Sequence, residues 1–585
     1  MSTDKDARRR ELKVGGLGLA TGGLSFGLDS LPIHDNPEVL DVIGNVAGWG
    51  YTAGGLLVGG AIAHNRWYNM PHKRLERVLG EDGWLNRYDM KTSAGASAMR
   101  KQAEFLRPDL PGRPDGSRLR RHPVTEFATH VGEVVSGPRL MRGRDVYSPH
   151  SRGTLVLGPQ GSGKSSWLAH KVFDFPGGAY VSTTKPELAV MAAAARAQRG
   201  PVHIFNPSNF GGLGSSLAWD PVQGCQDQAV ADARAWALVR GGGGAAGIDR
   251  ADFWAQKAAE IIRCYLMAAA LAGYDMGAVH HWAVNADDPT PVAILEAHPN
   301  RAPSAWIGTF KTHLGASHNT RTGYFATVVS CVGFMDQPSV AAACRPGPSQ
   351  NFDILEFLKS GALFVIAGED NKRLAPLLTA LTEHIFSQAK IVASTCRGGR
   401  LPNGLAMILD EVAQTTPVPL DKWAADSRGW GIDVTAVVQD LAQLRTTWGP
   451  DRAATIYGNL PTKIVLPGVA HKEDLEQLAY LAGKRLVEKV SEGESVQDGG
   501  LLARRSVSTN RHSVYEPVIA GETIYGLPKW HAYVLGLAPR PVVVKFEPGY
   551  KRAKREHRKL SKAARQFALP QLSDHGGPVP AGATA

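Results

Sequence analysis

Residues 154–166 read TLVLGPQGSGKSS, and this stretch decides the fold class of the chain. The apolar run TLVL has the character of a buried strand, GPQGSG is a glycine-rich loop, and the residues that follow, SWLAHKVF, have helical character. A strand, this loop and a helix in that order form the context in which a P-loop binds phosphate. Its glycines let backbone N–H groups turn inward towards phosphate oxygens, and the helix presents its positive N-terminus to the same anion.

The loop predicts a binding site for ATP with Mg²⁺. We expect Lys164 to reach the β- and γ-phosphates and Ser165 to be a ligand of Mg²⁺. The residues predicted to contact the nucleotide are Gly158, Pro159, Gln160, Gly161, Ser162, Gly163, Lys164, Ser165 and Ser166. The alternative is a glycine-rich loop that arose by chance.

A second signal is the run LAMIL (405–409), which is followed by Asp410 and Glu411. A buried strand that ends in an acid can place Asp410 beside the P-loop, where it would hold Mg²⁺ directly or through water. Glu411 can then act as the general base that activates the attacking water. Many strands end in an acidic turn, so this pattern indicates a nucleotide site only in combination with the P-loop upstream.

The third signal is DSRGWGIDVTAVVQDLAQL (426–444), in which Arg428 precedes a strand and Gln439 ends it. Polar groups at the carboxyl ends of adjacent parallel strands converge on the ligand crevice. Gln439 could sense the γ-phosphate or position water, and Arg428 could act as an arginine finger across a subunit boundary. A structural salt bridge for Arg428 and a satisfied amide for Gln439 remain alternatives. Arg152, before the P-loop strand, is a further candidate for nucleotide contact.

Short apolar runs alternate with helical stretches from residue 151 onward, which indicates an α/β fold with a parallel sheet. We expect strands at 154–157, 179–182, 202–205, 362–368, 405–409, 434–438, 463–466, 531–537 and 541–546. The glycine-rich segment 240–250 resembles a hinge, and the helical periodicity beyond it indicates an all-α insertion over 251–335. The motor domain would thus comprise residues 150–250 and 336–547.

The N-terminal residues 1–66 predict a membrane anchor. Val14–Leu28 and Val42–Ala63 are free of charge, and the second is long enough to cross a hydrocarbon core about 30 Å thick. Basic residues flank both segments and acids lie between them, as expected for two transmembrane helices with both ends in the cytoplasm. A signal peptide or a buried glycine-rich hairpin in a soluble protein is the alternative. Residues 67–149, polar and without a strong period, would be a cytoplasmic neck.

Composition favours a folded protein with a polyanionic partner. The chain has 585 residues, 43% of them hydrophobic, and its formal net charge is +11. Most of this excess lies in the tail, residues 548–585, where eight basic residues and one Glu occur between Lys551 and Arg565. Their density suggests a solvated arm with charge on several sides, which would bind DNA phosphates or anionic lipid or only aid solubility. Five scattered cysteines indicate neither a metal framework nor disulfides.

These pieces together resemble the type IV secretion coupling proteins, the TraG/TraD group of conjugative ATPases. The matching segments follow the family's order: GPQGSGKS (158–165), AYVSTTKPE (179–187), VHIFNPSNF (202–210), LAWDPVQG (217–224), FWAQKAAEII (253–262), LDEVAQ (409–414), SRGWGIDVTAVVQDLAQL (427–444), WGPDRAATIYGNLPTKIVLPG (448–468) and LAGKR (481–485). One position departs from the pattern, because Thr183 stands where the family usually has an acid.

The resemblance implies a RecA-like P-loop motor with an all-α insertion and an N-terminal transmembrane hairpin. It implies a homo-hexamer at the cell membrane with a cytoplasmic motor, which couples relaxase–DNA complexes to a type IV secretion channel and moves single- or double-stranded DNA by ATP hydrolysis. Lys164, Ser165, Asp410 and Glu411 would carry the nucleotide chemistry, with Arg428 and Gln439 at further motif positions. The alternatives are a chromosome-segregation pump, an ATPase that exports protein effectors, and a nucleotide-gated membrane adaptor that does not pump.

Overall fold

A computed structural model describes residues 78–80, 82–108, 122–243, 251–347, 352–368, 372–497 and 504–559. The predicted membrane anchor, residues 1–66, lies outside these ranges. Within them, no helix is both long and apolar enough to span a membrane. The described residues divide into two compact units, and the smaller contains residues 78–80, 82–84, 136–140, 479–497 and 504–523. The larger contains the other described residues.

The larger unit is built on one eleven-stranded sheet with the order β2-β1-β13-β12-β9-β3-β8-β7-β4-β6-β5. The strands are β1 Ala128–Val134, β2 Asp145–Pro149, β3 Thr154–Leu157, β4 Gly178–Thr183, β5 Val202–Phe205, β6 Ala362–Ile366, β7 Leu405–Leu409, β8 Ile432–Val438, β9 Thr462–Val465, β12 His531–Leu535 and β13 Val542–Lys545. From β9 to β5 all neighbours are parallel, whereas β12, β13, β1 and β2 are antiparallel. The parallel strands β3, β4, β6, β7 and β8 are buried along their whole length, as expected for a sheet that helices cover on both faces.

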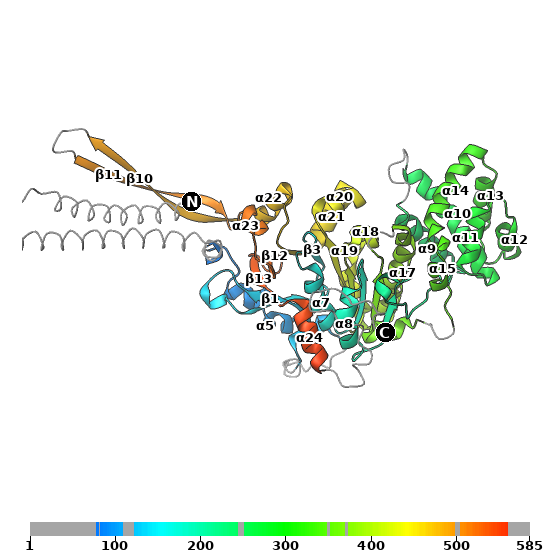
Figure 1. Ribbon diagram of the computed structural model, residues 1–585, viewed down its shortest axis with the longest axis horizontal. Coiled ribbons are helices and arrows are strands. Elements are labelled where there is room, and N and C mark those ends of the chain that lie inside the picture. Colours follow the sequence, from blue (N-terminus) through cyan, green and yellow to red (C-terminus); the bar gives the residue numbers. More distant parts are fainter. Residues whose placement is uncertain are drawn as a thin grey trace, which may run out of the picture. The chain divides into compact units, whose positions relative to one another are not determined.

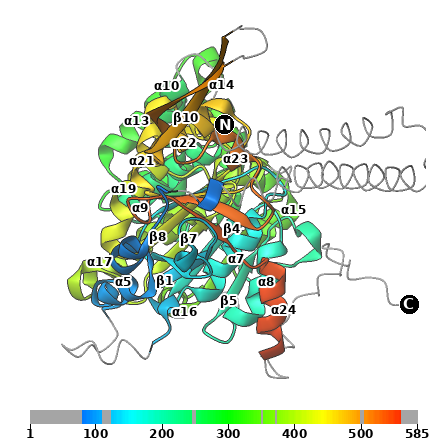
Figure 2. The ribbon, with the colours of Figure 1, turned by 90° about the vertical axis from the view of Figure 1, so that its left-hand side faces the viewer.

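Helices lie on both sides of this sheet (Figures 1 and 2). In Figure 2 the strands run between α17, α19 and α21 on the left and α8 and α24 on the right. The helices outside the insertion are α4 Arg87–Asp89, α5 Ala96–Lys101, α6 Ala103–Leu106, α7 Lys164–Asp174, α8 Glu187–Arg196, α9 Gln228–Gly241, α16 Ile354–Ser360, α17 Ala375–Thr395, α18 Val412–Thr415, α19 Leu420–Trp430, α20 Leu441–Trp448, α21 Pro450–Asn459, α22 Lys472–Leu481, α23 Gly521–Tyr525 and α24 Gly549–Lys559.

A bundle of helices fills the stretch between α9 and β6 (green in Figure 1). Its helices are α10 Ala251–Ala272, α11 Met276–Val284, α12 Thr290–Ala297, α13 Ser304–Leu314, α14 His318–Val332 and α15 Pro338–Ala343. The long α10 is the centre of the bundle, where it contacts α11, α12, α13 and α14, and it also packs against α9. The helical region therefore extends beyond the boundary expected at residue 335.

Each apolar run that the sequence predicted as a strand lies on a strand of the sheet. The prediction of a polar neck over residues 67–149 is wrong for residues 128–149, because β1 and β2 pair there and extend the antiparallel end of the sheet. The sequence hides these strands because β1 is irregular. Its register against β2 shifts between His130 and Gly132, which interrupts the alternation of side chains.

The smaller unit contains a two-stranded ribbon that the sequence did not predict. β10 Lys484–Gln497 and β11 Arg504–Pro517 pair antiparallel, in register from Lys484 opposite Pro517 to Gln497 opposite Arg504. Both strands are rich in charged and hydroxyl side chains and lack a clear apolar face. Long strands of this composition gain their order from cross-strand pairing more than from burial, so a hydropathy pattern does not reveal them.

A buried ion pair joins the P-loop helix α7 to the neighbouring strand β8. Lys171 Nζ lies 2.7 Å from Asp433 Oδ1 and 2.5 Å from Thr435 Oγ1. The side chains of Lys171 and Asp433 are each only 2% exposed. Because a charge buried this deeply needs its partner, the pair fixes α7 against the sheet.

We therefore expect Lys171→Met to lower the free energy of unfolding by about 3–5 kcal/mol, because Asp433 stays buried without a counter-charge. The double variant Lys171→Met/Asp433→Val should recover most of this loss, since no lone charge remains. The control is Lys472→Met, which removes an exposed pair with Glu476 and should cost less than about 1 kcal/mol. Thermal unfolding of the full chain measures these differences. Equal midpoints for Lys171→Met and Lys472→Met would contradict the role given to the buried pair.

Candidate nucleotide-binding site

The loop 158–163 joins β3 to α7, and its shape depends on glycine. Gly161 and Gly163 have φ angles of 79° and 100°, in the left-handed region that other residues rarely adopt. At Gly158 the constraint is space, because a Cβ atom there would lie 2.6 Å from Ser162 Oγ and 2.9 Å from Leu466 Cβ. The loop thus requires glycine at three positions, as expected for a loop that wraps closely around a phosphate.

Lys164 begins α7, and its side chain folds back over the loop. Its Nζ atom donates a hydrogen bond of 2.9 Å to the carbonyl oxygen of Gly158. Burial lowers the pKa of Lys164, while the nearby negative charges of Asp410 and Glu411 act in the opposite direction. The amine is thus held at the P-loop, close to both acids that the sequence singled out.

Asp410 follows β7 and is buried at the carboxyl end of that strand. Its Oδ2 atom accepts a hydrogen bond of 3.2 Å from Thr183 Oγ1, whereas Oδ1 is buried without a hydrogen-bond partner among the described residues. Burial first, and then the charge of Glu411, raise the pKa of Asp410 to about 7, against the opposing effect of Lys164. A buried oxygen of this kind needs a partner, and a divalent cation with oxygen ligands fits it.

Thr183, the departure from the family pattern, has a structural role in this site. β4 lies beside β7 in parallel register, with Ser182 opposite Leu409, so Thr183 comes next to Asp410. Its hydroxyl group is a neutral donor to the buried carboxylate. An acid at this position would add a second negative charge beside Asp410, which already has Glu411 as a neighbour.

Glu411 has a backbone conformation that is unusual for a residue with a side chain. Its φ and ψ angles are 49° and 47°, in the left-handed region, and the short helix α18 begins immediately after it. Such a conformation costs on the order of 1–3 kcal/mol and persists only where the surrounding structure imposes it. The turn holds Glu411 next to the buried Asp410, whose pKa the charge of Glu411 raises.

Gln439 lies at the same edge of the sheet. β8 pairs with β3 so that Val438 is opposite Leu157, and the amide of Gly158 donates to the carbonyl of Val438 over 3.3 Å. Gln439 therefore follows β8 directly beside the start of the P-loop. The order β3-β8-β7-β4 thus gathers the P-loop, Gln439, Asp410 and Thr183 at one crevice, which is where ligands bind in parallel α/β sheets.

Residues 404–529 match the family model described as the TraM recognition site of TraD and TraG. Over this segment the chain is similar to the type IV coupling proteins TraD and TraG. Among solved structures, it resembles the bacterial conjugative coupling protein TrwBdeltaN70 in complex with sulphate, at 19% identity and a TM-score of 0.51, over 75% of this chain and 93% of that one. No curated protein sequence matches it.

Two further solved structures resemble this chain at lower TM-scores. Plasmid coupling protein TrwB in complex with ADP and Mg²⁺ is 21% identical, with a TM-score of 0.49 over 69% of this chain and 87% of that one. VirB4 of Thermoanaerobacter pseudethanolicus is 12% identical, with a TM-score of 0.39 over 72% of this chain and 96% of that one. The mixed α/β fold with its large parallel sheet is thus the fold of the TrwB coupling protein.

The structure separates Arg428 and Arg152 from this crevice. Arg428 is exposed in the last turn of α19, before β8 begins, and Arg152 precedes β3. Both lie at the amino ends of their strands, whereas the P-loop follows the carboxyl end of β3. The guanidinium group of Arg152 donates to the carbonyl of Gly536, away from the P-loop of its own subunit. Burial and the nearby charge of Arg428 lower the pKa of Arg152.

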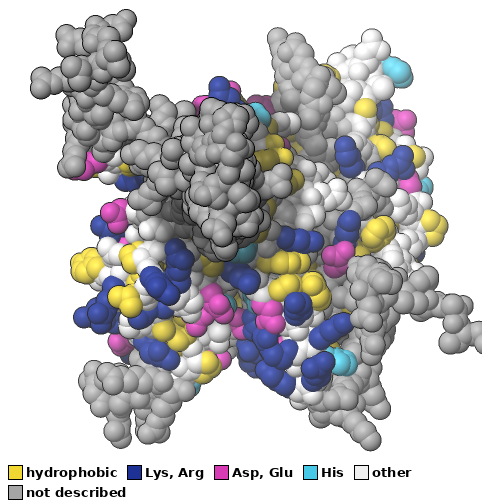
Figure 3. Space-filling model, turned by 60° about the vertical axis from the view of Figure 1, so that its left-hand side comes forward, with side chains coloured by type: hydrophobic (Ala, Val, Ile, Leu, Met, Phe, Trp, Pro, Cys, Tyr) yellow, Lys and Arg dark blue, Asp and Glu magenta, His cyan; other side chains and the backbone are white. Residues whose placement is uncertain are grey.

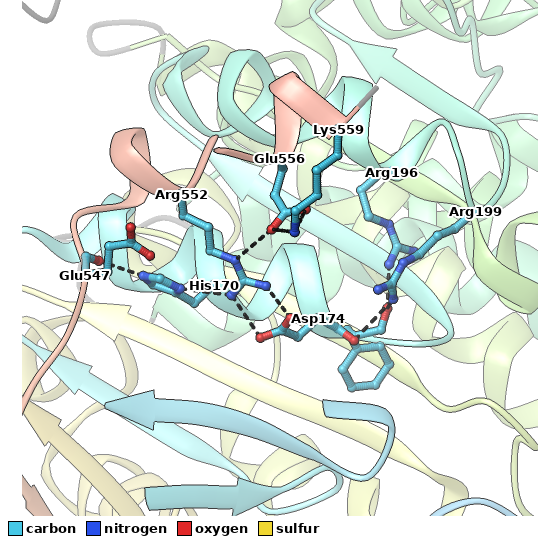
Figure 4. A network of polar contacts seen from close by, with 9 residues as sticks. His170, Asp174, Arg196, Arg199, Glu547, Arg552, Glu556 and Lys559 are labelled. Carbon is cyan, nitrogen blue, oxygen red and sulfur yellow. Dashed lines mark hydrogen bonds and ion pairs between the residues drawn. The ribbon is translucent and has the colours of Figure 1, made fainter. Parts of the chain in front are cut away.

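The basic tail differs from the expected solvated arm over its described residues. Gly549–Lys559 form α24, which packs against α7 and α8 (Figure 4). Arg552 points inward, donates to both carboxylate oxygens of Asp174 and contacts His170 Nδ1 at 2.9 Å. Burial lowers the pKa of His170 to about 4, so His170 is a neutral acceptor for Arg552. A Cβ atom on Gly549 would lie 2.9 Å from Ser166 Cα, so glycine lets α24 approach the first turn of α7.

Sequence reasoning missed this packing because it treated all the tail charges alike. Arg552 has a buried acceptor in Asp174, whereas Lys551, Lys554, Arg555 and Arg558 are exposed and share the spacing of one helix face. A polar network thus joins His170 and Asp174 of α7 to Arg552 of α24. Sequence reasoning also missed Trp530, whose ring lies against Gly163. No local motif links a residue so distant in the sequence to the P-loop.

Proposed function

We propose that this chain hydrolyses ATP and couples hydrolysis to the transfer of DNA through a type IV secretion channel during conjugation. The observation that carries the proposal is the convergence of Lys164, Asp410 and Glu411 at one P-loop. A nucleotide-gated adaptor needs the loop to bind phosphate but has no use for a carboxylate held in a strained turn beside it. The fold of the coupling protein TrwB and the TraG/TraD family match support the biological setting.

Each residue of the nucleotide site has a separate role in the proposed ATP hydrolysis. Mg²⁺, held by Ser165 and the unpartnered Oδ1 of Asp410, would neutralise phosphate charge when bound. When nucleotide binds, the Lys164 amine leaves the carbonyl of Gly158 and donates to β- and γ-phosphate oxygens instead. Glu411 accepts a proton from water as the water oxygen bonds to the γ-phosphorus, and the bond from that phosphorus to the β–γ bridging oxygen breaks to give ADP and phosphate. Gln439 orients the water or senses the γ-phosphate.

Arg428 fits a role in a neighbouring subunit better than one in its own. It is exposed and lies at the edge of the sheet away from its own P-loop. In a homo-hexameric ring, an exposed arginine of this kind can reach the γ-phosphate bound by the next subunit, as an arginine finger. The remaining parts of the proposal are a cell-membrane anchor in residues 1–66, a cytoplasmic motor, and relaxosome and channel proteins as partners.

α24 supplies a surface for the proposed DNA. In its outward face, Lys551, Lys554, Arg555 and Arg558 are exposed at helical spacing. Lys and Arg side chains gather low in the middle of the view in Figure 3, and α24 lies at the lower edge of the unit in Figures 1 and 2. Such a face binds phosphates by releasing counterions and does not read base sequence. Because α24 packs on α7, DNA bound there would lie one helix away from the P-loop.

The first test concerns the acid pair. Glu411→Gln keeps the shape of the side chain but removes the base, so ATP should still bind while its hydrolysis falls about 100- to 10,000-fold. Lys164→Ala should abolish hydrolysis, and Asp410→Asn should weaken binding of Mg²⁺–ATP. Glu356→Gln, an exposed residue of α16, serves as the control and should hydrolyse ATP at the parental rate. Parental hydrolysis by Glu411→Gln would assign the base to another residue.

The second test concerns the basic face of α24. Neutralising Lys551, Lys554, Arg555 and Arg558 to glutamine should weaken DNA binding about equally for unrelated sequences. The slope of log affinity against log salt for duplex DNA should become shallower by about 0.9 for each phosphate that the variant no longer neutralises. A matched control neutralises four exposed basic residues on other elements: Lys359, Arg397, Arg452 and Lys472. Basal ATP hydrolysis should persist in both variants, because neither changes the P-loop.

DNA titrations at several salt concentrations measure both quantities. An unchanged affinity and salt slope in the α24 variant would remove this face from the DNA path. Loss of binding to anionic vesicles with DNA binding intact would assign it to a membrane surface instead.

A further inference from the structure

An aromatic side chain lies directly beside the P-loop without belonging to any motif. Trp530 precedes β12, and a Cβ atom on Gly163 would lie 3.2 Å from its Cζ3 atom and 3.5 Å from its Cε3 atom. Gly163 is the residue before Lys164, so the indole ring reaches the point where the loop turns into α7. A Cβ atom there would be in tight contact with the ring, so the ring lies directly against the loop.

Two neighbouring aromatic rings hold the indole in place. The buried Phe546 meets it edge-to-face, with ring centroids 6.0 Å apart and planes at 89°. Tyr550, in the first turn of α24, lies 6.1 Å away at 67° and is 41% exposed. Trp530 is only half-buried itself, so these contacts orient the ring without enclosing it. Lys529 Nζ lies over the ring, 5.0 Å from its centroid. A flat ligand could stack on the indole in place of this flexible side chain.

The backbone of Trp530 supports a specific placement. Its φ angle is 67°, in the left-handed region, which is a marked outlier for a residue with a bulky side chain. The carbonyl of Trp530 accepts a hydrogen bond of 2.9 Å from the amide of Phe546, which secures this turn in the sheet. Strained residues of this kind persist where the surrounding fold imposes them, and they cluster at ligand sites.

We propose that Trp530 is the base-stacking residue of the nucleotide site and that the ligand is a purine nucleoside triphosphate. The inference rests on the proposed ATPase function. With the phosphates in the loop and at the N-terminus of α7, the ribose and base extend past the loop, and Trp530 provides an aromatic face beside it. Stacking recognises the face of a purine and not its hydrogen-bonding edge. The site therefore accepts ATP and GTP with similar affinity.

The test compares nucleotides with a ligand that has the same phosphates but no base. Affinities of the full chain for ATP, GTP and inorganic tripolyphosphate are measured by calorimetry with Mg²⁺ present. Trp530→Ala should weaken ATP and GTP binding roughly 5- to 100-fold and leave tripolyphosphate binding within about twofold. Trp530→Phe should retain most of the nucleotide affinity because it keeps an aromatic face. Trp306→Ala, a half-buried tryptophan of the insertion, is the control and should bind all three ligands like the parent.

The outcomes separate this inference from the proposed function. Parental ATP affinity in Trp530→Ala overturns the stacking role and leaves the ATPase proposal intact. Equal weakening of ATP and tripolyphosphate by Trp530→Ala and Trp530→Phe also overturns it, because the ring would then only support the loop. A parental chain that binds neither ATP nor tripolyphosphate overturns the ATPase proposal itself.

Discussion

A buried carboxylate that lacks half of its hydrogen bonds is the constraint on which the rest of the site depends. Asp410 lies at the end of β7 with one oxygen bound to Thr183 and the other without a partner among the described residues. Leaving such a group buried is costly, and here the cost is raised by Glu411 next to it. A bound cation would supply the missing partner of Asp410. The P-loop, which would bind the cation together with the nucleotide phosphates, lies two strands away.

α7 connects this site to the rest of the larger unit. Its first residue, Lys164, closes over the P-loop, its middle is fixed to β8 by the Lys171–Asp433 pair, and its last residue, Asp174, holds Arg552 of α24. Along its length, α7 thus contacts the P-loop, the sheet and α24. α24 in turn carries the basic face proposed for DNA and Tyr550, which contacts Trp530. The contacts of these few residues link the nucleotide and the proposed DNA surface.

Local patterns in the sequence were enough to predict the P-loop and the strands of the parallel sheet. Asp410, Glu411 and Gln439 follow from the same logic, since residues after adjacent parallel strands meet at one edge. What the sequence did not show depends on long-range contacts. β1 is hidden by a shift in register, and the β10–β11 ribbon has no apolar face. The partner of Arg552 and the ring beside Gly163 come from segments far away in the chain, and no spacing rule brings them together.

The central claim is that this P-loop site hydrolyses ATP in a reaction linked to DNA. The most direct measurement is the rate of ATP hydrolysis by the full chain with and without single- and double-stranded DNA. The account predicts Mg²⁺-dependent hydrolysis that rises when DNA is added. A chain that binds ATP but does not hydrolyse it, with either form of DNA or without DNA, would contradict the claim and favour an adaptor that uses nucleotide only as a switch.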